Sequence, residues 1–171
     1  ITVALGYASM AEAADAITAL LPFCPVACEG FGRRIVEVVA RSGKPVPDLP
    51  RGDGWIFVEL RADSNAQARR DANALVSASN ALDGRVVTDE REAAALWRIR
   101  ADGAGLAGVS LDKPAWAGWE DAAVPPERLG AYLRDFDRLL AEYDLHGLPY
   151  GHFGEGCVHC RIDYPLDEPD G

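Results

Sequence analysis

Residues 151–159, GHFGEGCVH, hold two of the chain's three histidines, His152 and His159. They join two predicted strands, near residues 149–153 and 158–164, through a glycine-rich turn. Across a tight turn two imidazoles can lie on one side of the chain, as a divalent-metal site requires. A structural turn whose histidines only form nearby hydrogen bonds explains the spacing equally well.

Outward from this turn, the apolar pattern predicts alternating helices and strands. The strongest helical face spans residues 125–143 and ends before Gly147. Residues 55–60, WIFVEL, form the clearest strand. Residues 101–118 are rich in Gly, Ala and Pro without a period, which predicts a long loop. The alternation alone is typical of a parallel doubly wound sheet, but no glycine-rich phosphate-binding turn follows any predicted strand.

The composition indicates one globular domain. Hydrophobic residues make up 49% of the 171 positions and charged residues 26%, and the net charge is −10. The negative field repels phosphate backbones and anionic lipids, and no apolar run approaches the roughly 20 residues of a membrane span. We therefore expect no nucleic-acid partner and no membrane span. A small anionic substrate would need local arginines.

The ends of the chain suggest a piece of a longer protein. The chain begins at Ile1 without a signal-peptide pattern and ends at Gly171. We interpret residues 1–171 as a single domain excised from a longer chain, which we expect to be cytoplasmic. A peripheral membrane association through an electron acceptor is the alternative.

The four cysteines form two close pairs, Cys24 with Cys28 and Cys157 with Cys160. The first pair lacks the glycines and the polar turn of a zinc knuckle. The second pair lies on a predicted strand, where a three-residue offset points the side chains to opposite faces. We predict four free, buried cysteines and no disulfide.

Arg100 is unusual because it shares a helical face with Ala93, Leu96 and Trp97. Its stem could cover apolar surface while its head reaches water. Alternatively, the guanidinium points into a site.

At the histidine turn the chain resembles a known family. GHFGEGCVH resembles the GHxGDGNxH signature of the FAD-linked oxidase C-terminal domain, found in flavoproteins of the vanillyl-alcohol oxidase and D-lactate/D-2-hydroxyglutarate dehydrogenase type. Residues 96–100, LWRIR, resemble the family's LWxxR helix, and residues 120–125, EDAAVP, its DvavP strand. The run AGWEDAAVPPERLGAYLRDF, together with Cys157, is most similar to the subgroup fused to a C-terminal iron–sulfur module.

The resemblance implies a fold and a reaction. The fold is α+β: an antiparallel sheet with ferredoxin-like halves and helices on one face. The chain would be the substrate-binding domain of an FAD-dependent dehydrogenase that oxidises a D-2-hydroxy acid, such as lactate or 2-hydroxyglutarate, to the 2-oxo acid. A non-catalytic metal- or ligand-binding module of the same fold is the alternative.

The resemblance also assigns site residues. His152 and His159 occupy the positions of the catalytic residues that ligate a divalent, zinc-like metal, and the third ligand, a glutamate, is expected beyond Gly171. Arg100 would contact the substrate carboxylate, and Arg161 takes the family's polar position two residues beyond the second histidine.

The chain differs from the family pattern at two positions, and the resemblance also implies two further domains. Cys157 replaces the signature asparagine, and Trp119 replaces a lysine of some members, which affects the exact substrate. FAD would be bound mainly by an upstream domain and an iron–sulfur cluster by a downstream module of the same chain. The isolated fragment is expected to be inactive.

Overall fold

The computed structural model describes residues 1–106, 108 and 113–169. In these residues, seven antiparallel strands form one sheet: β1 (Thr2–Tyr7), β2 (Ala27–Gly32), β3 (Gly54–Glu59), β4 (Asp83–Val87), β5 (Trp116–Ala123), β6 (Gly147–Gly151) and β7 (Cys157–Ile162). Six α-helices accompany it: α1 (Met10–Asp15), α2 (Ile17–Leu20), α3 (Arg33–Arg41), α4 (Asn65–Ala78), α5 (Glu90–Leu106) and α6 (Leu129–Glu142). The predicted α+β class with an antiparallel sheet is confirmed. Among the described helices, none is both long and apolar enough to cross a membrane.

The sheet consists of two related halves in the order β4-β1-β3-β2-β6-β7-β5. The first half follows the ferredoxin-like pattern strand-helix-strand-strand-helix-strand, with α3 inserted between β2 and β3. The second half, β5-α6-β6-β7, repeats the first three strands of that pattern, because β7 lies between β5 and β6 as β3 lies between β1 and β2. The two halves meet where β2 pairs with β6.

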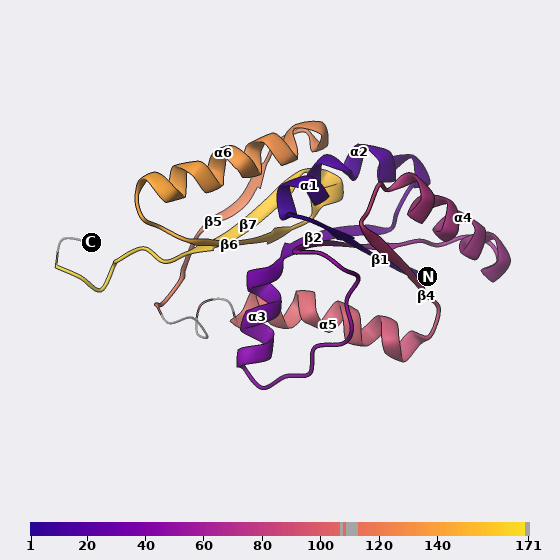
Figure 1. Ribbon diagram of the computed structural model, residues 1–171, viewed down its shortest axis with the longest axis horizontal. Coiled ribbons are helices and arrows are strands. Elements are labelled where there is room, and N and C mark those ends of the chain that lie inside the picture. The colour runs from indigo at the N-terminus through magenta and orange to yellow at the C-terminus, as the bar shows by residue number, and fades with distance from the viewer. Residues whose placement is uncertain (107, 109–112, 170–171) are drawn as a thin grey trace.

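Helices cover both faces of the sheet, so the prediction of helices on one face is wrong (Figure 1). Alternate residues of β3 enter two separate cores: Ile56 and Val58 pack with α1, α2, α4 and α6, whereas Trp55 and Phe57 pack with α3 and α5. Every residue of β1 is buried. A strand that is apolar on both sides needs a cover on each face.

Helix α5 is longer than the sequence predicts. Residues 101–106 continue the helix instead of opening the predicted loop, despite Gly103 and Gly105. Gly103 is buried where α5 crosses α3, and a Cβ at this position would overlap Ile35. The glycine that weakens the helical signal therefore allows the two helices to pack closely. Residues 107 and 109–112 of the predicted loop lie outside the described residues.

The joint between the halves is short and depends on glycine. In the described structure β2 and β6 pair only through Gly30 with Gly151 and Phe31 with Tyr150. The fully buried ring of Phe153 lies against Gly30, so a Cβ there would overlap it. At the end of the turn, Gly156 has φ 69° and accepts a hydrogen bond from the backbone N–H of Val124 at 3.1 Å. Glycine adopts this left-handed conformation without a steric penalty.

The joint predicts the effect of Gly30→Ala. The added methyl group must displace Phe153, and such overpacking costs about 1–3 kcal/mol of unfolding free energy. Urea denaturation of wild type and variant measures the loss. Gly105→Ala is the matched control, because a Cβ there meets nothing within 4 Å and should leave stability equal or slightly higher. Equal stability of Gly30→Ala and wild type would contradict the packing described.

Candidate functional site

Strand β7 separates polar from apolar side chains by simple alternation. Val158, Cys160 and Ile162 are buried against the cores that contain α6. The intervening residues, Cys157, His159 and Arg161, are half-buried on the opposite face. This is the face that α3 and α5 cover over the neighbouring strands (Figure 1). Two of the predicted site residues therefore lie side by side at the edge of that helical layer.

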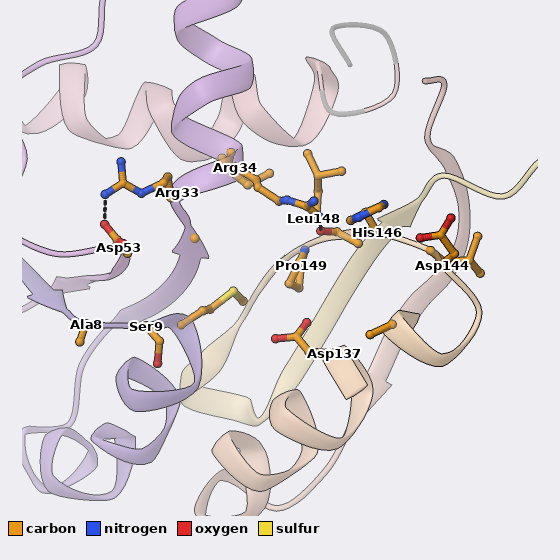
Figure 2. Close-up of a pocket in the computed structure, with 16 residues that line it drawn as sticks. Ala8, Ser9, Arg33, Arg34, Asp53, Asp137, Asp144, His146, Leu148 and Pro149 are labelled. Atoms are coloured by element: carbon orange, nitrogen blue, oxygen red, sulfur yellow. Dashed lines mark hydrogen bonds and ion pairs between the residues drawn. The ribbon is translucent and has the colours of Figure 1, made fainter. Parts of the chain in front are cut away.

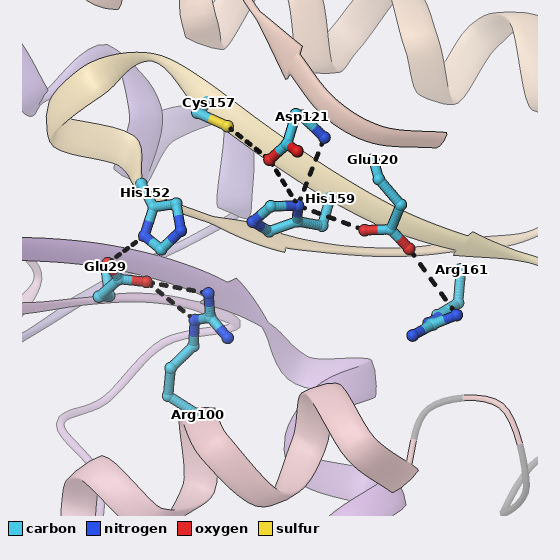
Figure 3. A network of polar contacts seen from close by, with 8 residues as sticks. All are labelled: Glu29, Arg100, Glu120, Asp121, His152, Cys157, His159 and Arg161. Carbon is cyan, nitrogen blue, oxygen red and sulfur yellow. Dashed lines mark hydrogen bonds and ion pairs between the residues drawn. The ribbon is translucent and has the colours of Figure 1, made fainter. Parts of the chain in front are cut away.

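Glu29 of β2 connects the two other predicted site residues. Its Oε1 lies 2.6 Å from Nδ1 of His152, and its Oε2 lies 3.0 Å from Nε and from Nη2 of Arg100. The side chains of Glu29 and Arg100 are each only 13% exposed. The guanidinium also lies over the ring of Tyr150, 4.7 Å from its centroid. Arg100 thus points into the polar network and not into solvent (Figure 3).

The second histidine contacts two carboxylates of β5. Nδ1 of His159 lies 3.2 Å from Oε2 of Glu120 and 3.5 Å from Oδ1 of Asp121. Glu120 in turn lies 3.7 Å from Nη1 of Arg161, whose Nε is buried without a hydrogen-bond partner among the described residues. Glu120 therefore links His159 to Arg161, as Glu29 links His152 to Arg100.

The two imidazoles fit a shared metal ion. Their ring centroids are 5.2 Å apart and the rings are perpendicular. Two imidazoles on one tetrahedral zinc ion hold their ring centres about 5 Å apart, given Zn–N bonds of about 2.0–2.1 Å. For His152, a carboxylate that accepts a proton from Nδ1 leaves Nε2 as the free ligand atom. Nδ1 of His159 accepts from the backbone N–H of Asp121 at 3.4 Å, and in Figure 3 the remaining nitrogens of the two rings face each other.

The sequence did not reveal Glu29 or Tyr150 as site residues. Glu29 is 123 positions from His152, and only the sheet order brings β2 next to β6. A single acid at the end of the apolar run at residues 26–28 was the available signal. Tyr150 pairs with His159 across β6 and β7, and its ring lies 5.4 Å from the imidazole.

All four cysteines are free, as predicted. Cys160 and Cys157 lie on opposite faces of β7, also as predicted, but Cys24 is exposed and Cys157 only half-buried, so the prediction of four buried thiols is wrong. Burial, and then the negative charge of Asp121, raise the pKa of the Cys157 thiol. Its Sγ lies 3.8 Å from Oδ1 of Asp121.

A cavity of about 580 Å³ lies elsewhere, beside Gly147 at the other end of β6 (Figure 2). Its arginines already have partners: Arg33 pairs with Asp53, and Arg34 donates to the carbonyl oxygen of Gly147 at 2.7 Å. None of the predicted site residues lines it. The histidine network remains the candidate site.

A known protein family matches the whole chain. The family described as FAD linked oxidases, C-terminal domain, matches residues 1–171. The chain belongs to this family. The resemblance inferred from the GHFGEGCVH signature is thereby confirmed.

Three proteins to which the chain is similar are named as dehydrogenases of D-2-hydroxy acids. A D-lactate dehydrogenase of Archaeoglobus fulgidus is 27% identical over 140 residues, 79% of this chain and 29% of that protein. A mitochondrial D-2-hydroxyglutarate dehydrogenase of Rattus norvegicus is 27% identical over 122 residues, 69% of this chain and 22% of that protein. A D-2-hydroxyglutarate dehydrogenase of Escherichia coli is 43% identical over 53 residues, 29% of this chain and 5% of that protein. The chain spans less than a third of each relative.

The network predicts a large effect of Glu29→Gln on stability. The change leaves the largely buried Arg100 without its counter-charge, which should cost about 3 kcal/mol of unfolding free energy. Removing the second charge in Glu29→Gln/Arg100→Met should recover part of this loss, which a double-mutant cycle in urea measures.

Asp53→Asn serves as the control for Glu29→Gln. It breaks the Arg33–Asp53 pair, whose side chains are 57% and 49% exposed, and should barely move the unfolding midpoint. Equal losses from both substitutions would contradict a special role for the buried pair.

Proposed function

We propose that this chain is the substrate-binding domain of an FAD-dependent dehydrogenase that oxidises a D-2-hydroxy acid to the 2-oxo acid. The observation that carries the proposal is the convergence of His152, His159, Arg100 and Arg161 on one polar network (Figure 3). The names of the similar proteins, D-lactate and D-2-hydroxyglutarate dehydrogenase, support this substrate class.

The charge of the network supports a bound cation. Two arginines face three carboxylates, those of Glu29, Glu120 and Asp121, so with neutral imidazoles the site carries a net negative charge. An anionic substrate would be repelled by this site, within a chain of net charge −10. A divalent cation held by His152 and His159 reverses the sign of the local charge. The donor set, two imidazoles beside carboxylates, suits zinc or a similar ion.

The residues of this chain would orient the substrate. Nε2 of His152 and of His159 would hold the metal, with Glu29 fixing the tautomer and the ring position of His152. When bound, such a metal lowers the pKa of a coordinated hydroxyl and neutralises a carboxylate. Arg100 uses Nε and Nη2 for Glu29, which leaves Nη1 for the substrate carboxylate, and Arg161 offers its unpartnered Nε. FAD supplies the redox chemistry.

The proposal includes two domains outside residues 1–171. An upstream domain would bind FAD, and a downstream module would carry an iron–sulfur cluster. The 53-residue match fills only 5% of the Escherichia coli relative, so that relative is long enough for several domains. The glutamate that completes the metal site is expected from the segment after Gly171.

Removal of the metal tests the proposal directly. Exhaustive chelation of the full-length enzyme should abolish turnover of the 2-hydroxy acid, and added Zn²⁺ should restore it. His152→Ala and His159→Ala should each lower kcat/KM at least about 100-fold, because each removes a ligand of a group that contributes several kcal/mol.

The control is the third histidine, His146, which contacts Asp163 outside this network. His146→Ala should retain turnover. Full activity after chelation, with His152→Ala and His159→Ala unimpaired, would refute the metal site and favour a non-catalytic module.

Arg100→Lys should lower kcat/KM for the 2-hydroxy acid about 10- to 100-fold. This factor corresponds to the loss of a charge-assisted hydrogen bond of about 1.5–3 kcal/mol. A lysine ammonium cannot serve Glu29 and a carboxylate with the geometry of a planar guanidinium. Steady-state kinetics of the full-length enzyme measures the change. Arg98→Lys, an exposed position on the same helix, is the control. Unchanged kinetics of Arg100→Lys would refute its contact with substrate.

A further inference from the structure

A second group of metal-ligating atoms lies on the other side of His159. Sγ of Cys157, a carboxylate oxygen of Asp121 and a ring nitrogen of His159 all lie within 4.8 Å of one another. Figure 3 shows Asp121 between the thiol and the imidazole. The group is separate from the proposed His152–His159 site, because here it is Nδ1 of His159 that faces the other donors.

Two of the three distances between these atoms match a tetrahedral zinc site, and the third lies within 4.8 Å. With bonds of about 2.3 Å to sulfur and about 2.1 Å to oxygen or nitrogen, tetrahedral angles place sulfur and oxygen about 3.6 Å apart and nitrogen and oxygen about 3.4 Å apart. The observed distances are 3.8 Å from Sγ of Cys157 to Oδ1 of Asp121 and 3.5 Å from that oxygen to Nδ1 of His159. An ion could be held with only small shifts of side chains.

Two features of the backbone bring the three donors together: side-chain alternation along β7 and a bulge in β5. Cys157 and His159 are two residues apart on β7, so both point to the same face. Asp121 lies on the paired strand β5, where the register shifts between Trp119 and Ala122. Its φ of 55° is in the left-handed region, which is uncommon for residues other than glycine. Such a bulge changes the direction of a side chain, and here the carboxylate points to the thiol and the imidazole.

We propose that Cys157, Asp121 and Nδ1 of His159 form a binding site for a thiophilic divalent cation such as Zn²⁺ or Cd²⁺. A thiolate, an imidazole and a carboxylate are all ordinary zinc ligands. The Asp121 side chain is 81% exposed, so the ion has access from solvent and water can complete its coordination. The site depends on the cysteine that replaces the asparagine of the GHxGDGNxH signature.

The site has a consequence for the proposed catalytic metal. An imidazole that coordinates through Nδ1 keeps its remaining proton on Nε2. His159 then has no free nitrogen for the His152 side, so the two cations compete for one ring. This consequence, unlike the site itself, rests on the proposed function: an excess of Zn²⁺ would inhibit turnover.

Titration of the full-length protein with Co²⁺ tests the site, because a cobalt–thiolate bond gives a near-ultraviolet charge-transfer absorption. Difference spectra should show this absorption saturating at one equivalent in the wild type. Cys157→Ser should remove it. Asp121→Asn should weaken Co²⁺ binding at least about 10-fold, as losses around metal sites typically do. Asparagine also tolerates the left-handed backbone, so this variant tests the ligand without disturbing the fold.

Two control variants separate this site from other thiols and from the proposed function. Cys24→Ser removes an exposed free cysteine and should leave the absorption intact. His152→Ala removes the proposed competing metal site, so the absorption should be retained and should saturate at the same or a lower Co²⁺ concentration. Absence of the absorption in the wild type, or its persistence in Cys157→Ser, would overturn the proposal. Neither result bears on whether chelation stops turnover, so failure of this site and failure of the proposed function remain distinguishable.

Discussion

The contact between the ring of Phe153 and the backbone of Gly30 holds the candidate site together. Phe153 is fully buried at the centre of the histidine turn, and it fills the space that a side chain at residue 30 would need. The contact fixes the turn against β2, next to the two residue pairs that join β2 to β6. His152 therefore lies within reach of Glu29, and Tyr150 lies beside both Arg100 and His159. A hydrophobic contact on one side of the sheet thus sets the polar geometry on the other.

The position of the proton on the His152 and His159 imidazoles determines which ring nitrogen is free to bind a ligand. Each imidazole has one nitrogen near a carboxylate, Glu29 for His152 and Glu120 or Asp121 for His159. At His152, a carboxylate that accepts the Nδ1 proton directs the free lone pair of Nε2 into the space between the rings. At His159, Nδ1 also accepts from the backbone N–H of Asp121 at 3.4 Å. His159 differs from His152 because a thiol also lies near its Nδ1. The same ring therefore has one nitrogen toward His152 and the other toward Cys157 and Asp121.

The sequence predicts short-range features of the site well and long-range features poorly. Strand alternation correctly predicts that Cys157 and Cys160 lie on opposite faces of β7. Glu29 could not be found this way, because its approach to His152 depends on the order of the strands. The fully apolar segments of β1 and β3 did carry a signal for helices on both faces, since one-sided strands alternate with polar residues. Gly103 misled the helix prediction because its role is to allow contact with Ile35, far away in sequence.

The site lies at the joint between two ferredoxin-like halves, which raises the entropy cost of forming it but positions its charged groups on rigid elements. Glu29 comes from the first half, the histidines come from the second, and Arg100 comes from the helix that connects β4 to β5. The contact between Glu29 and His152 cannot form until both halves have folded and paired, and such a non-local contact carries a large loop-closure entropy. The contacts of Glu120 with His159 and Arg161 lie within the second half. In return, the charged groups are held by strands β2, β5 and β7 and by helix α5, and not by one flexible loop. Small movements at the two-residue joint would change the distance between Glu29 and His152, so the packing of Phe153 on Gly30 sets how the two parts of the network meet.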